Sequence, residues 1–155
     1  MMPHRESTQQ GSKLIRFFEG FSPVRYLCPA NVWTIGYGHA IRKGEKWDSP
    51  TITITEPEAL ELLDKDNDEA EKAVSRLIRV SLEDCQFDAL VSFVYNLGGG
   101  ALQRSRLRSC LNREEYYEGS LEFDKWCWGG GRKLPGLIKR RRVERILFIT
   151  GVLNL

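Results

Sequence analysis

Three side chains near the start of the chain have types and a spacing that could carry out acid-assisted chemistry. Eight residues separate Glu19 from Cys28, and five separate Cys28 from Thr34. A carboxylic acid can give a proton to a leaving group, and a thiolate can act as a nucleophile or a base. Each residue also has an ordinary structural interpretation: a solvated helix-end carboxylate, a small buried thiol and a β-forming threonine. The elements around them must decide between these interpretations.

The local pattern places these side chains where a helix meets a sheet. Apolar residues recur at helical spacing up to Phe18, and Gly20 predicts that the first helix ends at Glu19. Residues 22–55 are rich in β-formers punctuated by Pro, Asn and Gly, which predicts a small antiparallel sheet with strands near 24–27, 32–38 and 51–54. A carboxylate at a helix C-terminus opposes the helix dipole, so this slightly unfavourable position of Glu19 fits a functional exception.

The remainder of the sequence predicts helices. Thr55 and Glu58 have the spacing of a capping box, which starts a long helix running to about Leu77. Residues 81–84 open a second helix whose apolar run makes it the expected core helix. Further helices are predicted at about 103–112, 114–126 and 136–150, separated by glycine triplets at 98–100 and 129–131.

These elements predict an α+β fold in which a small antiparallel sheet lobe and a larger helical lobe are joined by a long helix. We expect residues 1–155 to form a single domain. Residues 20–55 would form the small lobe, and residues 81–155 with the N-terminal helix would form the helical lobe. A cleft between two lobes is a natural place for a site.

Composition and charge exclude several classes of protein. The 155 residues are 41% hydrophobic and 28% charged, as in globular proteins, and the net charge is only +2. No apolar run is long enough to cross a bilayer, and the polar N-terminus from Met1 lacks the apolar segment of a secretory signal. The four cysteines are scattered, so we expect reduced thiols. The chain has only two histidines, His4 and His39, and the cysteines lack the spacing of metal ligands. We therefore expect no metal site.

Three ordered blocks of sequence resemble one family. The first is Glu19-x8-Cys28-x5-Thr34 with the following Thr-Ile-Gly-Tyr-Gly-His, and the second is residues 86–98, QFDALVSFVYNLG. The third is Trp126 with the glycine triplet, then Leu-Pro-Gly-Leu, Arg140-Arg141 and Glu144. Together they resemble the bacteriophage lysozymes, the endolysins of glycoside hydrolase family 24, over about residues 13–150. The resemblance is to the subset with cysteine where many members have aspartate.

The resemblance implies a lysozyme fold and a cofactor-free hydrolase for the β-1,4 bond between N-acetylmuramic acid and N-acetylglucosamine in peptidoglycan. Glu19 would be the general acid, in surroundings between the lobes that keep it protonated. Cys28 and Thr34 would position and activate a water. The family pattern implies inversion at the anomeric carbon, whereas covalent attack by Cys28 would give retention.

The C-terminal segment 132–145 is strongly basic and admits several interpretations. It carries seven Lys and Arg residues against one acid. A solvated face, a patch for the anionic cell wall, and a wall-binding or DNA-binding module without catalysis are the alternatives. Apolar residues in the same segment favour docking on the protein itself, so we expect no nucleic-acid partner. Arg140 and Arg141 are the candidate substrate-binding residues, near enough to Glu19 to influence its charge state, whereas the resemblance makes His39 structural.

The resemblance also implies where the protein acts. We expect a monomer that folds in the host cytoplasm, has no stable membrane insertion, and reaches the cell wall after a holin permeabilises the membrane. Peptidoglycan is the expected partner in host cell lysis.

Overall fold

The helix before the candidate site ends where the sequence predicts. In the computed structural model, which describes residues 3–155, α1 spans Gln9–Glu19. The Thr8 side chain accepts a hydrogen bond from the Gln10 amide at its start. Gly20 has φ +70° and donates its amide proton to the Arg16 carbonyl, so the helix ends at Glu19. Met1 and Met2, the start of the polar N-terminus, lie outside the described residues.

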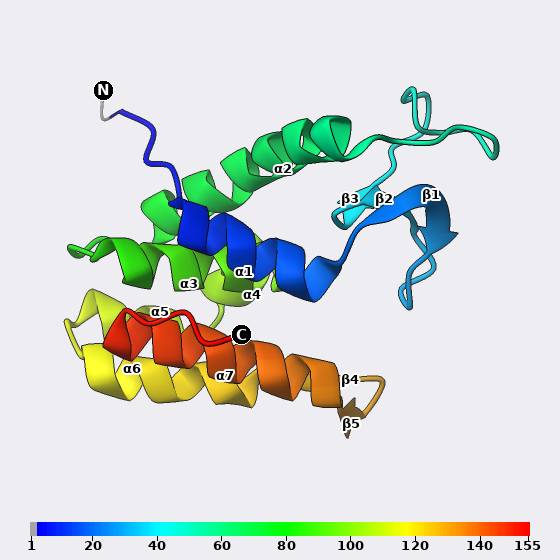
Figure 1. Cartoon of the computed structure of the whole chain (residues 1–155). Helices are drawn as coiled ribbons and strands as arrows, with labels where there is room; N and C mark the ends of the chain where they lie inside the picture. The colour runs from blue at the N-terminus through cyan, green and yellow to red at the C-terminus, as the bar shows by residue number, and fades with distance from the viewer. Residues whose placement is uncertain (1–2) are drawn as a thin grey trace.

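The sheet that follows is a small antiparallel one of three strands, β1 (Ser22–Leu27), β2 (Trp33–Gly36) and β3 (His39–Ala40), in the order β1-β2-β3 (Figure 1). Tyr26 pairs with Thr34, and Ile35 pairs with His39. The register of β1 shifts between Ser22 and Tyr26. This part of the chain forms the small lobe.

The prediction of a strand at 51–54 was wrong. This segment makes only an isolated bridge between Thr53 and Val24. Its alternating isoleucines pack against the hydrophobic core instead: Ile54 is buried and Ile52 half-buried. The irregular first half of β1 offers it one further backbone hydrogen bond, from the Ile54 amide to the Pro23 carbonyl. The apolar alternation therefore reflects burial rather than strand pairing.

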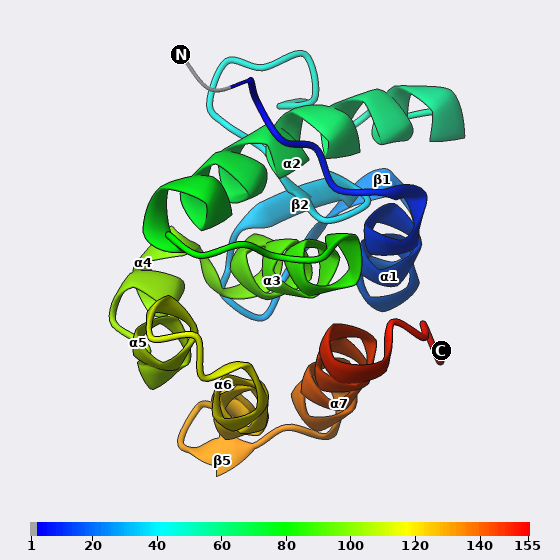
Figure 2. The same ribbon diagram turned by 90° about the vertical axis from the view of Figure 1, so that its left-hand side faces the viewer.

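A long helix, α2 (Glu56–Leu77), leads from the small lobe to the helical lobe (Figure 1). Its predicted capping box is present, with Thr55 and Glu58 each bonding the other's backbone. The core helix α3 (Asp84–Leu97) lies at the centre of the molecule with α1, α2 and α7 packed around it (Figure 2). Its buried face is almost continuous, as expected for a helix surrounded by others.

The later helices differ in detail from the prediction. The glycine triplet at 98–100 is not a plain spacer: Gly98 ends α3 with φ +88°, and α4 (Gly99–Gln103) follows at once. Ser105 caps α5 (Arg106–Asn112) by accepting the Arg108 amide, which delays its start relative to residue 103. The helix predicted at 114–126 is α6 (Tyr116–Glu122) followed by a 3-10 turn at Phe123–Lys125.

The last part of the chain contains a hairpin that the sequence pattern did not predict. Strands β4 (Trp128–Gly129) and β5 (Arg132–Lys133) pair through the second glycine triplet, where Gly130 and Gly131 both have positive φ. The final helix, α7 (Pro135–Thr150), confirms the prediction for 136–150. None of the helices within residues 3–155 combines the length and hydropathy that a membrane crossing needs.

We expect Thr55→Ala to lower the free energy of unfolding by about 1 kcal/mol, because it removes the side-chain cap at the start of α2. Urea denaturation followed by circular dichroism measures the change. The control is Ser75→Ala, an exposed hydroxyl on the same helix. Equal stability of the Thr55 and Ser75 variants would show that the capping box does not hold α2.

Candidate active site

Glu19 lies where α1 turns into the sheet, at the junction of the two lobes. Its Oε1 atom is 2.7 Å from Nη1 of Arg140, a residue 121 positions later on α7. The Glu19 side chain keeps 20% of its surface exposed, whereas that of Arg140 keeps 4%. The ion pair therefore fixes the carboxylate from the interior and leaves its other side open.

Behind this pair lies a buried polar network. Arg140 Nη2 donates to the Ser92 carbonyl at 3.3 Å, and the Ser92 hydroxyl donates to Glu144 Oε2 at 2.6 Å. Arg141 Nη2 binds the same Glu144 oxygen at 3.0 Å. The Arg141 side chain has no exposed surface, so it occupies the core rather than a surface that substrate could reach. Of the two expected arginines, only Arg140 contacts Glu19.

Cys28, directly after β1, and Thr34, on β2, are hydrogen-bonded to the same carbonyl group. The Val32 carbonyl accepts the Cys28 amide at 3.0 Å and the Thr34 hydroxyl at 3.0 Å. Cys28 follows the last residue of β1 and is partly exposed, whereas Thr34 is buried. The tight turn between the strands, with Asn31 at φ +63°, brings the two side chains together.

Hydrogen bonds at this end of the sheet favour the thiolate form of Cys28. The pKa of Cys28 is lowered, first by hydrogen bonding with the Val32 backbone and further by hydrogen bonding with Ala30 and the Thr34 side chain, against a smaller opposing effect of burial. Burial raises the pKa of the nearby Tyr26, and the charges of Glu19 and Cys28 raise it further. Tyr26 therefore lies within electrostatic range of both groups.

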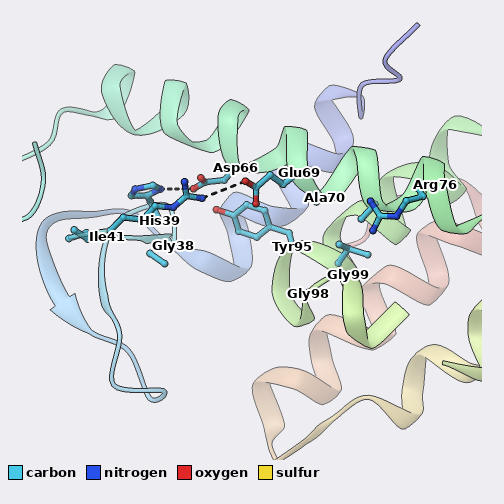
Figure 3. A pocket seen from close by; sticks show the side chains of 14 residues that line it. Gly38, His39, Ile41, Asp66, Glu69, Ala70, Arg76, Tyr95, Gly98 and Gly99 are labelled. Atoms are coloured by element: carbon cyan, nitrogen blue, oxygen red, sulfur yellow. Dashed lines mark hydrogen bonds and ion pairs between the residues drawn. The ribbon is translucent and has the colours of Figure 1, made fainter. Parts of the chain in front are cut away.

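A groove of about 480 Å³ runs between the small lobe, α2 and the end of α3 (Figure 3). Its lining combines backbone-exposing glycines, an aromatic ring and charged groups of both signs. The residues labelled in the figure are Gly38, His39, Ile41, Asp66, Glu69, Ala70, Arg76, Tyr95, Gly98 and Gly99.

Gly38 connects the groove to the carboxylate. It has φ +78°, and a Cβ atom there would lie 2.5 Å from Oε2 of Glu19. A side chain at this position would therefore strain the backbone and displace the acid. The Tyr95 hydroxyl donates a hydrogen bond to the Tyr37 carbonyl at 2.8 Å. This bond connects α3 to the turn between β2 and β3 that contains Gly38.

His39 holds the small lobe against α2. Its Nδ1 atom lies 2.8 Å from Asp66 and its Nε2 atom 2.9 Å from Glu45. Hydrogen bonding to Asp66, followed by that to Glu45, raises the pKa of His39 despite its burial. The ring is buried and both nitrogens are occupied, so the structural role expected of His39 agrees with its contacts.

Sequence reasoning missed several residues of the site. Each has an ordinary structural interpretation in the sequence. Gly38 lies at the end of a predicted strand, as turn glycines do. Asp66 is one of many acids on its helix, and Tyr95 continues the apolar run of the core helix. Only the meeting of β3, α2 and α3 gives them a shared groove. For Asp66 a signal existed, since helical spacing places it with the apolar Ala70 and Ala73 rather than with the exposed acids.

The basic segment 132–145 divides into two parts. Arg140 and Arg141 are buried in the polar network, while Arg132, Lys133 and Arg142 are exposed. The helix also buries Val143, as its apolar residues predict. The exposed charge is therefore smaller than the run of seven basic residues indicates.

The chain is similar to known proteins over most of its length. The Phage lysozyme family model matches residues 16–144. An endolysin of Bacillus phage B103 is 41% identical over 146 residues, which cover 93% of this chain and 54% of that endolysin. The chain thus spans about half the length of this relative.

Two solved structures share the whole fold. The endolysin from Escherichia coli O157:H7 phage FAHEc1 superposes with a TM-score of 0.88 at 31% identity, covering 100% of both chains. The muramidase domain of SpmX from Asticcacaulis excentricus has a TM-score of 0.83 at 32% identity, covering 94% of this chain and 99% of that one. The chain belongs to the phage lysozyme family, and its α+β fold with a small sheet lobe and a larger helical lobe is the lysozyme fold.

We expect iodoacetamide to alkylate Cys28 at lower pH than Cys85, because the pKa of Cys28 is lowered whereas burial raises that of Cys85. The thiolate is the reactive form, so the rate at Cys28 should reach its plateau first as the pH rises. Peptide mapping by mass spectrometry follows both sites in one sample, with Cys85 as the internal control. Coincident pH profiles would show that the Val32 turn does not stabilise a thiolate.

Proposed function

We propose that the chain is a lysozyme, an N-acetylmuramidase that hydrolyses the β-1,4 bond between N-acetylmuramic acid and N-acetylglucosamine in peptidoglycan. The observation that carries the proposal is the position of Glu19, a carboxylate fixed by Arg140 and lying beside Gly38, which lines a groove between the two lobes. The relation to endolysins and to a muramidase domain supports the substrate class. Residues 1–155 would act as one lysozyme domain.

In this proposal Glu19 is the general acid. Cleavage of a glycosidic bond passes through an oxocarbenium-like transition state, and the departing oxygen needs a proton. Glu19 has one oxygen held by Arg140 and the other beside Gly38. Because Gly38 has no side chain, a sugar oxygen in the groove can approach the carboxyl group.

Cys28 and Thr34 would act on the water that replaces the leaving group. The Cys28 thiolate would take a proton as the water oxygen bonds to the anomeric carbon, while the proton of Glu19 goes to the leaving oxygen. The Thr34 hydroxyl donates its proton to the Val32 carbonyl, so its oxygen lone pairs would accept a hydrogen bond from the water and orient it. This route gives inversion, and direct attack by the sulfur on the anomeric carbon would give retention.

The alternative of a wall-binding or DNA-binding module has less support. Two arginines of its basic segment are buried, and Arg140 is committed to Glu19. A binding module would have no need to hold a carboxylate by a buried cation beside a groove. Clearing of permeabilised Gram-negative cells separates the two functions, since a module that only binds leaves the wall intact.

The setting of the reaction follows from the same proposal. The partner would be peptidoglycan, reached as a monomer after a holin opens the membrane, with the host cytoplasm as the place of folding. The family relation to phage endolysins supports a role in host lysis. Expression of the chain without a permeabilising protein would then leave cells intact.

We expect Glu19→Gln to lower peptidoglycan hydrolysis by about a hundred- to ten-thousand-fold, because the amide has no proton to transfer. Turbidity loss of permeabilised cells measures activity, and thermal unfolding checks the fold. Glu118→Gln, at an exposed position on α6, is the matched control and should retain activity. Hydrolysis by the Glu19 variant at the wild-type rate would assign the protonation to another acid.

We expect Cys28→Asp to retain activity and Cys28→Ser to lose most of it, because aspartate can carry a negative charge near neutral pH and serine cannot. The same turbidity assay compares the two variants. Analysis of the product anomer then tells water activation, which yields the α-anomer, from covalent attack, which yields the β-anomer. Full activity of the serine variant would remove Cys28 from the mechanism.

A further inference from the structure

The segment before α1 brings a histidine against two carboxylates of α2. His4 Nε2 lies 3.2 Å from Glu71 Oε1 and 3.4 Å from Asp68 Oδ1. One ligand atom from each of the three residues lies within 4.8 Å of the other two. Helical periodicity turns Asp68 and Glu71 to the side of α2 opposite Asp66, which lines the groove. The cluster is therefore separate from the candidate active site.

The separations match those expected around a small metal ion. Zinc–nitrogen and zinc–oxygen bonds are about 2.0–2.2 Å long, so two ligand atoms on a zinc tetrahedron lie about 3.3–3.5 Å apart. The two distances from His4 Nε2 are close to that edge and longer than a strong charge-assisted hydrogen bond. Small side-chain rotations would bring all three atoms onto one ion.

The charges around the cluster are unbalanced. Glu71 is 3% exposed, and its described partners are His4 and the amide and hydroxyl of Ser7. Within residues 3–155, neither Lys nor Arg forms an ion pair with it. A cavity of about 280 Å³ beside it is lined by further acids, Glu6 and Asp64, and by no Lys or Arg. A buried carboxylate next to other acids favours a bound cation.

An independent observation points to a missing partner at the same place. Asn67 lines this cavity and is only 5% exposed. Its Oδ1 atom is buried, and no hydrogen-bond donor among the described residues reaches it. Buried amide oxygens are almost always satisfied, so Asn67 marks a place beside the cluster where a hydrogen-bond donor is missing.

We propose that His4, Asp68 and Glu71 form a binding site for a divalent metal ion of the zinc class. Imidazole nitrogen combined with two carboxylates suits zinc better than calcium or magnesium, which take all-oxygen sites. Three protein ligands leave a further coordination position for water, which can face the cavity lined by Asn67. The site revises the expectation of no metal, which rested on sequence spacing alone.

The other histidine shows why geometry rather than composition defines the site. His39 also contacts two carboxylates, but Asp66 binds Nδ1 and Glu45 binds Nε2, on different edges of the ring. These acids cannot converge with the ring on one ion. At His4 both acids face the same nitrogen. A metal there would join the N-terminal segment to α2 and stabilise the folded chain.

Titration of ZnCl₂ into the untagged, EDTA-treated full chain tests the proposal by calorimetry, after iodoacetamide has blocked exposed thiols. We expect one zinc ion per chain and a rise in melting temperature with zinc. His4→Gln and Asp68→Asn should each weaken binding by at least about tenfold and remove the zinc-dependent rise. Glu61→Gln, an exposed acid on the same helix, should behave as wild type.

The zinc-dependent change in melting temperature distinguishes ligation from a packing role of His4, because a looser N-terminal segment would lower stability equally with and without metal. Wild-type affinity in His4→Gln would overturn the proposal. Binding of CaCl₂ or MgCl₂ in preference to ZnCl₂ would also overturn it, since His4 would then not be a ligand.

Discussion

The contact between Glu19 and Arg140 is the interaction on which the rest of the site depends. It joins the end of α1 to α7 across 121 residues of sequence and places a charge at the junction of the lobes. A buried guanidinium needs hydrogen-bond acceptors, and Ser92 on the core helix supplies two more for Arg140, its hydroxyl and its carbonyl oxygen. The carboxylate position is therefore set by three helices that have to pack together before the site exists.

The same network explains why the C-terminal helix is rich in arginine without being a basic surface throughout. Glu144 accepts hydrogen bonds from Arg141 and Ser92, so two consecutive arginines can point inward. Removing the Glu144 charge would leave the buried Arg141 without its carboxylate partner, which costs more than the loss of a surface pair. In this protein the ion network fixes the relative positions of α3 and α7, and the acid gains its orientation from that packing.

The acidic side chains of α2 divide among three surroundings. Asp66 holds His39 and the small lobe, Glu71 holds the N-terminal segment at His4 and Ser7, and others remain in solvent. Asp88 on α3 accepts the Thr8 amide at 2.7 Å, and burial raises its pKa. The long helix is thus attached both to the small lobe and to the N-terminal segment, and it also lines the groove.

The sequence by itself determined the α+β class, the end of α1 at Glu19, the capping box of α2 and the family, because these features depend on local spacing and ordered motifs. It did not predict the β4–β5 hairpin or the burial of Ile54 without strand pairing. Nor could it show that Arg140 contacts Glu19 while Arg141 lies in the core, since the two arginines are adjacent and chemically alike. That difference depends on which direction each side chain takes from α7 toward α1 and α3, and only the packed tertiary structure fixes it.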